Sequence, residues 1–206
     1  MQIGPTYIYK CPECDKLCGR GSLLSGNTFG STYFSDGKVI SPMLPDYPDI
    51  VKCKKCKTFF WLEDKNHIDY CDGFADFDGF HVQFLDTDEY FEALNAGIAR
   101  NKKEELYLRK YLWWSFNDRT RNGKDLFLTE SEKEIYEANC VKLMALFGNK
   151  EQTLVAELYR NLGNFTECID TLESIKSKNI IWLKNILKNE CFKENTLVIE
   201  LNDEDD

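Results

Sequence analysis

The chain has 206 residues, of which 43% are hydrophobic and 14% aromatic. This content suffices for one large domain or two small ones and argues against wholesale disorder. The formal net charge of -9 is uneven, because residues 1–60 carry 8 basic and 5 acidic side chains while the remainder carries 18 and 30. An acidic body repels a phosphate backbone, so nucleic acid is not the expected partner.

No apolar run approaches the roughly 20 residues that cross a bilayer, and the first residues lack the basic and apolar regions of a signal peptide. We therefore expect a soluble, cytoplasmic protein that makes no membrane contact. In a reducing cytosol the nine cysteines are better explained as metal ligands and small buried side chains than as disulfides. Burial is expected for Cys140, Cys168 and Cys191, which lie on apolar helical stretches.

Residues 1–62 predict a small β module, because short β-type runs are separated by Gly, Ser, Asp and Pro. The dipeptide Asp36-Gly37 joins two such runs, 32–35 and 38–41. It predicts a hairpin with a two-residue type I′ turn.

Residues 63–86 have the least regular pattern. Their aromatic side chains recur three or four residues apart, but Gly73 and Gly79 interrupt any helix. We therefore expect an aromatic-rich linker that is ordered and packs between the two halves.

From residue 87 the apolar side chains recur with a period near 3.6, which predicts helices. Asp86 or Thr87 can cap the first helix, and early acidic residues suit the helix dipole. Breaks that contain glycine separate the segments. The predicted helices cover residues 88–99, 102–119, 130–147, 150–162, 165–176 and 179–190.

Two Cys-x-x-Cys turns stand 38 residues apart. A two-residue spacer lets both thiolates of one turn reach the same metal, and a second turn completes a tetrahedral four-sulfur site. Four protein ligands leave no open position, so the sequence predicts one structural zinc ion. Its ligands are Cys11, Cys14, Cys53 and Cys56. Rubredoxin-like iron uses the same four sulfurs, and four reduced core cysteines are the remaining alternative.

The cysteine turns resemble the knuckles of a zinc ribbon over about residues 9–62. Their separation is longer than in the commonest ribbons, which indicates an insertion around residues 22–48. The lysines of the second knuckle either contact phosphates or offset the charge of four thiolates on a divalent metal. Side chains without knuckle spacing are expected to be packed or partly exposed, with a substitute ligand, a second metal site or a Cys-His pair as alternatives. They are Cys18, Cys71, His67 and His81.

Residues 156–175 resemble one tetratricopeptide repeat. Ala156 and Cys168 fall at the small positions that let two antiparallel helices approach closely, and Tyr159 falls at the aromatic position. The usual closing proline is absent. Because one repeat cannot bury its faces alone, neighbouring helices must pack on it and form a short solenoid or an irregular bundle.

Aromatic side chains concentrate around Trp113 and Trp114, on a helix that also carries Arg109. Core packing is the default explanation, since aromatics at helical spacing usually anchor a bundle. The sharper hypothesis is a groove on the helical face that binds a protein or peptide, because Trp and Arg are enriched at binding hot spots. Its predicted contacts are Trp113, Trp114, Arg109 and Tyr159.

The whole chain resembles bacterial proteins that join an N-terminal zinc ribbon to tetratricopeptide-like helices. The matching stretches include Cys-Pro-x-Cys, residues 26–30 and the run from Trp113 to Asp118. The expected fold is α+β, a zinc-ribbon β module followed by an all-α tetratricopeptide-like domain. The expected divisions are the β module at 1–62, the linker at 63–86, the helical domain at 87–195, and a β-prone segment with an acidic tail at 196–206.

No phosphate-binding loop, nucleophile elbow, metalloprotease or dinucleotide motif is present in the sequence. The sequence therefore favours a non-catalytic, zinc-stabilised protein-interaction module, a scaffold or adaptor of unknown partner. The alternatives are a nucleic-acid-associated factor that uses the basic knuckle, an enzyme, and a redox protein based on iron or Cys71. The sequence leaves the oligomeric state open.

Overall fold

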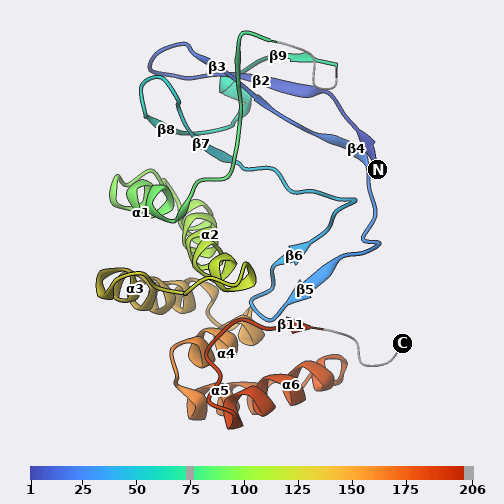
Figure 1. Cartoon of the computed structure of the whole chain (residues 1–206), viewed down its shortest axis with the longest axis vertical. Coiled ribbons are helices and arrows are strands. Elements are labelled where there is room, and N and C mark those ends of the chain that lie inside the picture. The colour runs from blue at the N-terminus through green and yellow to red at the C-terminus, as the bar shows by residue number, and fades with distance from the viewer. Residues whose placement is uncertain (73–76, 202–206) are drawn as a thin grey trace. The chain divides into compact units, whose positions relative to one another are not determined.

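The computed structural model describes residues 1–72 and 77–201, and this part has a mixed α+β fold with six α-helices and several small sheets (Figure 1). The chain divides into two compact units. The first comprises Met1–Ser31 and Ile40–Ile98, and the second comprises Thr32–Val39 and Ala99–Asp206. This division differs from the predicted one, because the hairpin near residue 36 groups with the helices and the first helix groups with the β strands.

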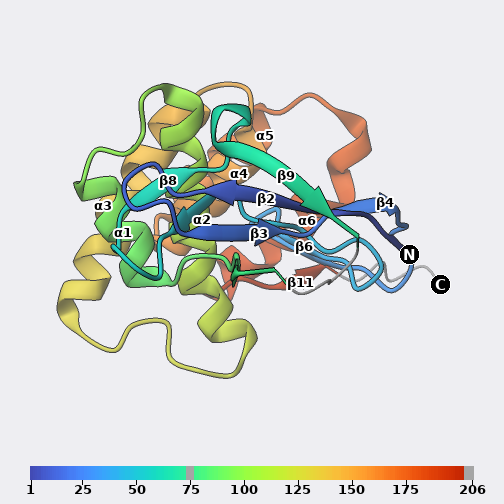
Figure 2. The same ribbon diagram turned by 90° about the horizontal axis from the view of Figure 1, so that it is seen from above.

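The main sheet of the first unit has the strand order β10-β3-β2-β9. Its strands are β2 (Thr6–Lys10), β3 (Leu17–Arg20), β9 (His67–Cys71) and β10 (Gly79–His81). Strand β2 pairs antiparallel with β3 and β9, and the three lie side by side in Figure 2. Strand β10 pairs in parallel with β3.

The predicted linker at 63–86 is more than a connection, because it supplies both edge strands of this sheet. In the sequence Gly79 is interpreted as a residue that interrupts a helix, but in the structure it begins the strand β10. A Cβ at this position would lie 2.7 Å from the Leu17 carbonyl oxygen, so the close pairing of β10 with β3 requires glycine. Gly73, on which the prediction also relied, lies outside the described residues, as does the acidic tail from residue 202.

Two short antiparallel pairs complete the β structure of the first unit. They are β1 (Gln2–Ile3) with β4 (Leu23–Ser25), and β7 (Ile50–Lys52) with β8 (Phe59–Trp61). A short 3-10 turn, Asp64–Asn66, precedes β9. A small cluster of buried side chains packs between the sheets, and its members are Tyr9, Cys11, Cys18, Val51, Cys53 and Phe60.

The helices begin and end within two residues of the predicted positions, except that the first ends at Asn95, four residues before its predicted end. They are α1 (Thr87–Asn95), α2 (Lys102–Arg121), α3 (Glu130–Phe147), α4 (Gln152–Asn161), α5 (Phe165–Ser174) and α6 (Ile181–Phe192), with a 3-10 turn at Lys178–Ile180. Asp86 caps α1 by accepting the Glu89 N–H at 2.9 Å, and the Glu89 side chain bonds back to Asp86. This capping box is the start signal that the sequence carries.

A small sheet in the second unit has the order β11-β5-β6. Its strands are β5 (Thr32–Phe34), β6 (Val39–Ile40) and β11 (Glu200–Leu201). The predicted hairpin and the predicted C-terminal strand are both confirmed. The turn type is different, because Gly37 is the loop residue with positive φ, at 75°. The Gly37 N–H donates to the Phe34 carbonyl at 2.9 Å, so a three-residue loop replaces the type I′ turn.

A buried ion pair joins this hairpin to α4 and to the C-terminal segment. Glu157 and Arg160 are both fully buried and pair at 2.5 Å. The Ser35 hydroxyl donates to Glu157 at 2.6 Å, and the Ile199 N–H donates to that hydroxyl at 3.1 Å. Arg160 also donates to the Leu197 carbonyl at 2.9 Å. Burial raises the pKa of Glu157, and the Arg160 charge opposes the shift.

A second buried ion pair joins the hairpin tip to α2. Asp36 has no exposed surface and pairs with Arg121. Asn117 donates to the Asp36 carboxylate at 2.8 Å, and the Trp114 indole donates to the backbone carbonyl of Asp36 at 3.0 Å. The Arg121 guanidinium lies 4.5 Å from the centre of the Phe34 ring. The hairpin is therefore a structural part of the helical unit.

Replacing Glu157 tests the first of these pairs. Glu157→Ala is expected to lower the free energy of unfolding by about 3–5 kcal/mol, because it leaves the Arg160 guanidinium buried without its counter-charge. Urea unfolding followed by far-UV circular dichroism measures the loss. The control is Glu134→Ala at an exposed position of α3, which should leave the midpoint unchanged. Equal losses in both variants would contradict the role of the pair.

Candidate metal centre

Each cysteine pair lies at the tip of an antiparallel β pair. Residues 11–14 lie in the turn between β2 and β3, and residues 53–56 lie in the turn between β7 and β8. We call these turns the first and second knuckles. The strands on either side fix where each knuckle points, because both ends of the turn are held by pairing.

The two knuckles have the same backbone geometry. In the first, the Asp15 N–H donates to the Cys11 carbonyl at 3.1 Å. In the second, the Lys57 N–H donates to the Cys53 carbonyl at 2.9 Å. Asp15 and Lys57 both adopt positive φ, at 61° and 65°. This conformation costs a non-glycine residue about 1–2 kcal/mol, and it occurs directly after the second cysteine of each knuckle, where the chain turns back towards the next strand.

The sulfur atoms of the two knuckles converge. The Sγ atoms of Cys11 and Cys56 are 3.6 Å apart, as are those of Cys14 and Cys53, and all four lie within 4.8 Å of one another. A disulfide needs about 2.05 Å, so these thiols are free. Four sulfurs at about 2.3 Å from a tetrahedral zinc ion are about 3.8 Å apart, which the observed spacing approaches. The predicted four cysteines can therefore hold one metal ion.

The thiols differ in how readily they lose a proton. Burial raises the pKa of Cys11 to about 12. Hydrogen bonds from the side chain and backbone of Thr58 lower the pKa of the exposed Cys56 to about 6. A thiolate is the form that binds metal, so binding must release protons, most of all at buried Cys11.

The other candidate ligands do not join the cluster. Cys18 is fully buried in the core of the first unit, where burial raises its pKa to about 12, and Cys71 is half-buried at the end of β9. The centre of the His67 ring lies 5.4 Å from that of Tyr7 and 5.5 Å from that of Tyr9. Within residues 1–72 and 77–201, the four knuckle cysteines are the one grouping of His, Cys, Asp or Glu that could hold a metal.

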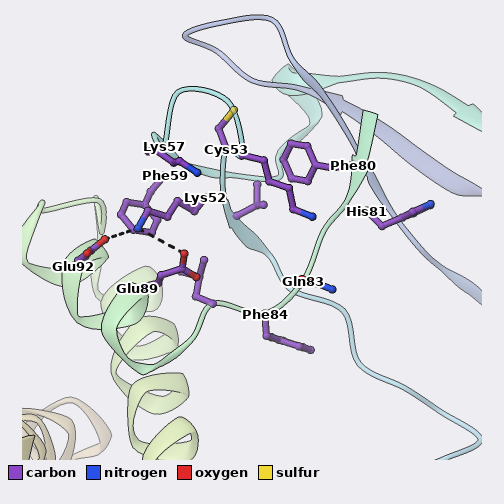
Figure 3. A pocket seen from close by; sticks show the side chains of 13 residues that line it. Lys52, Cys53, Lys57, Phe59, Phe80, His81, Gln83, Phe84, Glu89 and Glu92 are labelled. Atoms are coloured by element: carbon purple, nitrogen blue, oxygen red, sulfur yellow. Dashed lines mark hydrogen bonds and ion pairs between the residues drawn. The ribbon is translucent and has the colours of Figure 1, made fainter. Parts of the chain in front are cut away.

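The lysines of the second knuckle have different surroundings. Lys52 Nζ lies 2.6 Å from Glu92 and 3.6 Å from Glu89, both on α1 (Figure 3). Lys54 Nζ lies 5.3 Å from the centre of the Phe80 ring. The sequence reasoning missed the two glutamates, although their spacing of three places them on one face of a helix. They offset the positive charge at this knuckle.

The predicted contacts on the helical face are largely internal. Trp113 is fully buried and its indole donates to Asn161 at 3.0 Å, so it is a core residue, as the default interpretation expects. Trp114 donates to the hairpin backbone. Arg109 pairs with Glu105 at 2.7 Å and is mostly covered. Tyr159 packs against the cluster formed by α4, α5 and α6. These four side chains therefore do not form an open groove.

Comparison with known protein families, with curated proteins and with solved structures finds no match for this chain. None of the helices in residues 1–72 and 77–201 combines the length and the apolar character needed to cross a bilayer. The function must therefore be inferred from the geometry of the site.

Metal analysis tests the ligand set. Protein purified without added metal is expected to contain one equivalent of metal. The double variant Cys53→Ser with Cys56→Ser should lose it, because two of the four sulfurs are removed. Cys71→Ser is the matched control and should keep the full equivalent. Loss of metal from the Cys71 variant, or its retention in the double variant, would show that the ligand set is different.

Proposed function

We propose that this chain is a non-catalytic, zinc-stabilised protein-interaction module. The observation that carries the proposal is the convergence of four cysteine sulfurs within 4.8 Å of one another. Four sulfur ligands complete the tetrahedral coordination of zinc and leave no position for a substrate or an activated water. The ion then stabilises the fold by holding the two knuckles together. Partners bind to the protein surface.

Zinc is the proposed ion because closed four-cysteine sites in small β modules are characteristic of structural zinc. We further propose that this module is an elaborated zinc ribbon. In support, each knuckle lies at the tip of an antiparallel pair, and the chain between the knuckles includes the hairpin that groups with the second unit. Rubredoxin-like iron would occupy the same sulfurs and would bring redox chemistry instead.

We propose a tetratricopeptide-like arrangement for α4, α5 and α6, the architecture that the repeat-like sequence of residues 156–175 implies. Helix α4 packs against α5, and α5 against α6, with Ala156 and Cys168 fully buried. Such stacking of neighbours leaves extended surfaces that bind proteins or peptides. In place of the buried Trp113, α6 offers apolar contacts, since Trp182 and Phe192 are 46% and 76% exposed.

Cobalt substitution tests whether the metal site is closed. A four-thiolate Co²⁺ centre has characteristic tetrahedral absorption bands, and we expect added azide to leave them unchanged because no coordination position is open. A shift of these bands would reveal an exchangeable ligand and would favour an enzyme. Visible absorption by protein purified without added metal would indicate iron and would overturn the choice of zinc.

Photo-crosslinking in cells tests the interaction role. With the crosslinker at Trp182, we expect one dominant protein adduct, because this side chain is exposed and apolar. The matched control is the crosslinker at Glu134, an exposed position on another helix, which should not give that adduct. The adduct should form again with the purified partner. Crosslinks to RNA or DNA in place of protein would support the nucleic-acid alternative.

A further inference from the structure

A cleft of about 550 Å³ opens in the first unit beside the second knuckle (Figure 3). One wall is the chain that runs from β7 into the knuckle, residues 51–54. The other wall is formed by residues 80–81, at the end of β10, and by residues 83–85 in the segment that follows it. Glu89 and Glu92 of α1 also line the cleft. The whole cleft lies within one compact unit.

The cleft follows the free edge of β7. Val51 and Lys52 are successive residues of β7, and successive side chains of a strand point to opposite faces. A cleft that both residues line therefore runs along the edge of the strand, and it continues past Cys53 and Lys54 of the knuckle. Within the described residues β7 pairs with β8 in a two-stranded sheet. Its other edge is therefore not paired with a strand, and such an edge is a template for a further strand.

The hydrogen-bond pattern shows which backbone groups face this edge. Lys52 is paired with Phe59, and the next residue, Cys53, donates its N–H to the Thr58 carbonyl at 2.9 Å. Bonded and non-bonded pairs alternate along an antiparallel ladder, so Lys52 and Phe59 form a non-bonded pair. The N–H and C=O of Lys52 consequently point away from β8, towards the side on which an added strand would lie.

The charges that line the cleft are of two kinds. Lys52 is already held by the carboxylates of Glu89 and Glu92. Lys54 and Lys57 also line the cleft, and within the described ranges neither forms an ion pair. These two ammonium groups are thus available to an acidic partner. Next to them, the rings of Phe59, Phe80 and Phe84 provide apolar contacts.

We propose that this cleft binds an extended, acidic peptide segment of a partner protein, which adds as a strand to the free edge of β7. The peptide backbone bonds to Lys52, alternate acidic side chains meet Lys54 and Lys57, and the apolar side chains between them contact the phenylalanine rings. This mode takes its affinity from main-chain bonds and its specificity from alternate side chains. The proposal rests on the interaction function proposed above and names a surface and a partner chemistry for it.

A peptide fits the cleft better than a nucleic acid does. The two α1 glutamates that line it would repel a phosphate backbone, and the chain carries a net charge of -9. A peptide presents neutral amides to this wall and can place its acidic side chains at the lysines only. An exposed strand edge adds specific main-chain bonds that a nucleic acid cannot supply.

Selection from a phage-displayed library of random decapeptides tests the proposal on the zinc-loaded full chain. We expect enriched peptides with β-prone residues and acidic residues at alternate positions. The double variant Lys54→Glu with Lys57→Glu should lower the affinity for the best synthetic peptide by about tenfold or more. In the selection it should enrich basic peptides instead. Lys55→Glu is the matched control, because Lys55 belongs to the same knuckle but does not line the cleft.

Backbone methylation tests the mode of binding. N-methyl groups on the odd-numbered or on the even-numbered amides of the selected peptide should have opposite results. One set should abolish binding and the other should be tolerated, since only one side of an added strand bonds to β7. Four outcomes would each overturn the proposal. The selection could enrich no peptide, or only peptides without acidic residues. The Lys55 control could weaken binding as much as the double variant does, or methylation could be tolerated on both sets of alternate amides. Preferential binding of a single-stranded RNA probe would overturn it in favour of nucleic acid.

The result is separable from the proposed function. Metal content and circular dichroism of every variant show whether the first unit is still folded. If the cobalt site is closed and the Trp182 crosslink identifies a protein partner while the peptide selection fails, the interaction function stands and the cleft assignment is wrong. If the cobalt site is open, the function itself is wrong, whatever the cleft binds.

Discussion

Four cysteine thiolates can share the small space between the two knuckles only when their negative charge is balanced. As thiolates they would repel one another, and the exposed Cys56 already favours that form, while burial opposes it at Cys11. A divalent cation bound to all four sulfurs would resolve the conflict. The buried core around the cysteines is small, and Cys11, Cys18 and Cys53 are themselves members of it. Metal binding and the folding of the first unit are therefore expected to be the same event.

The second unit is held by a different kind of interaction. Asp36 and Glu157 are buried carboxylates that each pair with a buried arginine: Asp36 of the hairpin pairs with Arg121 of α2, and Glu157 pairs with Arg160 within α4. Removing one partner from such a pair is costly, whereas apolar replacements of both are often tolerated. We interpret the pairs as devices that specify where the hairpin docks. They tie residues 32–39, which interrupt the first unit in sequence, to the helices.

Metal, strand edge and lysines form one chain of dependence in the first unit. A metal bound as proposed would fix the second knuckle and, through it, the end of β7; Lys52 at that end and Lys54 in the knuckle both line the cleft. A partner that binds there would stabilise the folded, metal-bound unit by mass action. A closed metal site would thereby influence binding at the proposed cleft without contacting the bound peptide.

Local signals in the sequence determined the four clustered cysteines and the helices, because Cys-x-x-Cys spacing, a period of 3.6 and a cap such as Asp86 act over a few residues. Contacts between distant residues were decided by the tertiary structure alone. The pairing of β9 and β10 with β2 and β3, the burial of Trp113, and the ion pair of Lys52 with Glu92 join segments that no local pattern connects. Strand pairing and ion pairing depend on which distant segments of the chain meet in space, and a local sequence pattern does not specify those segments.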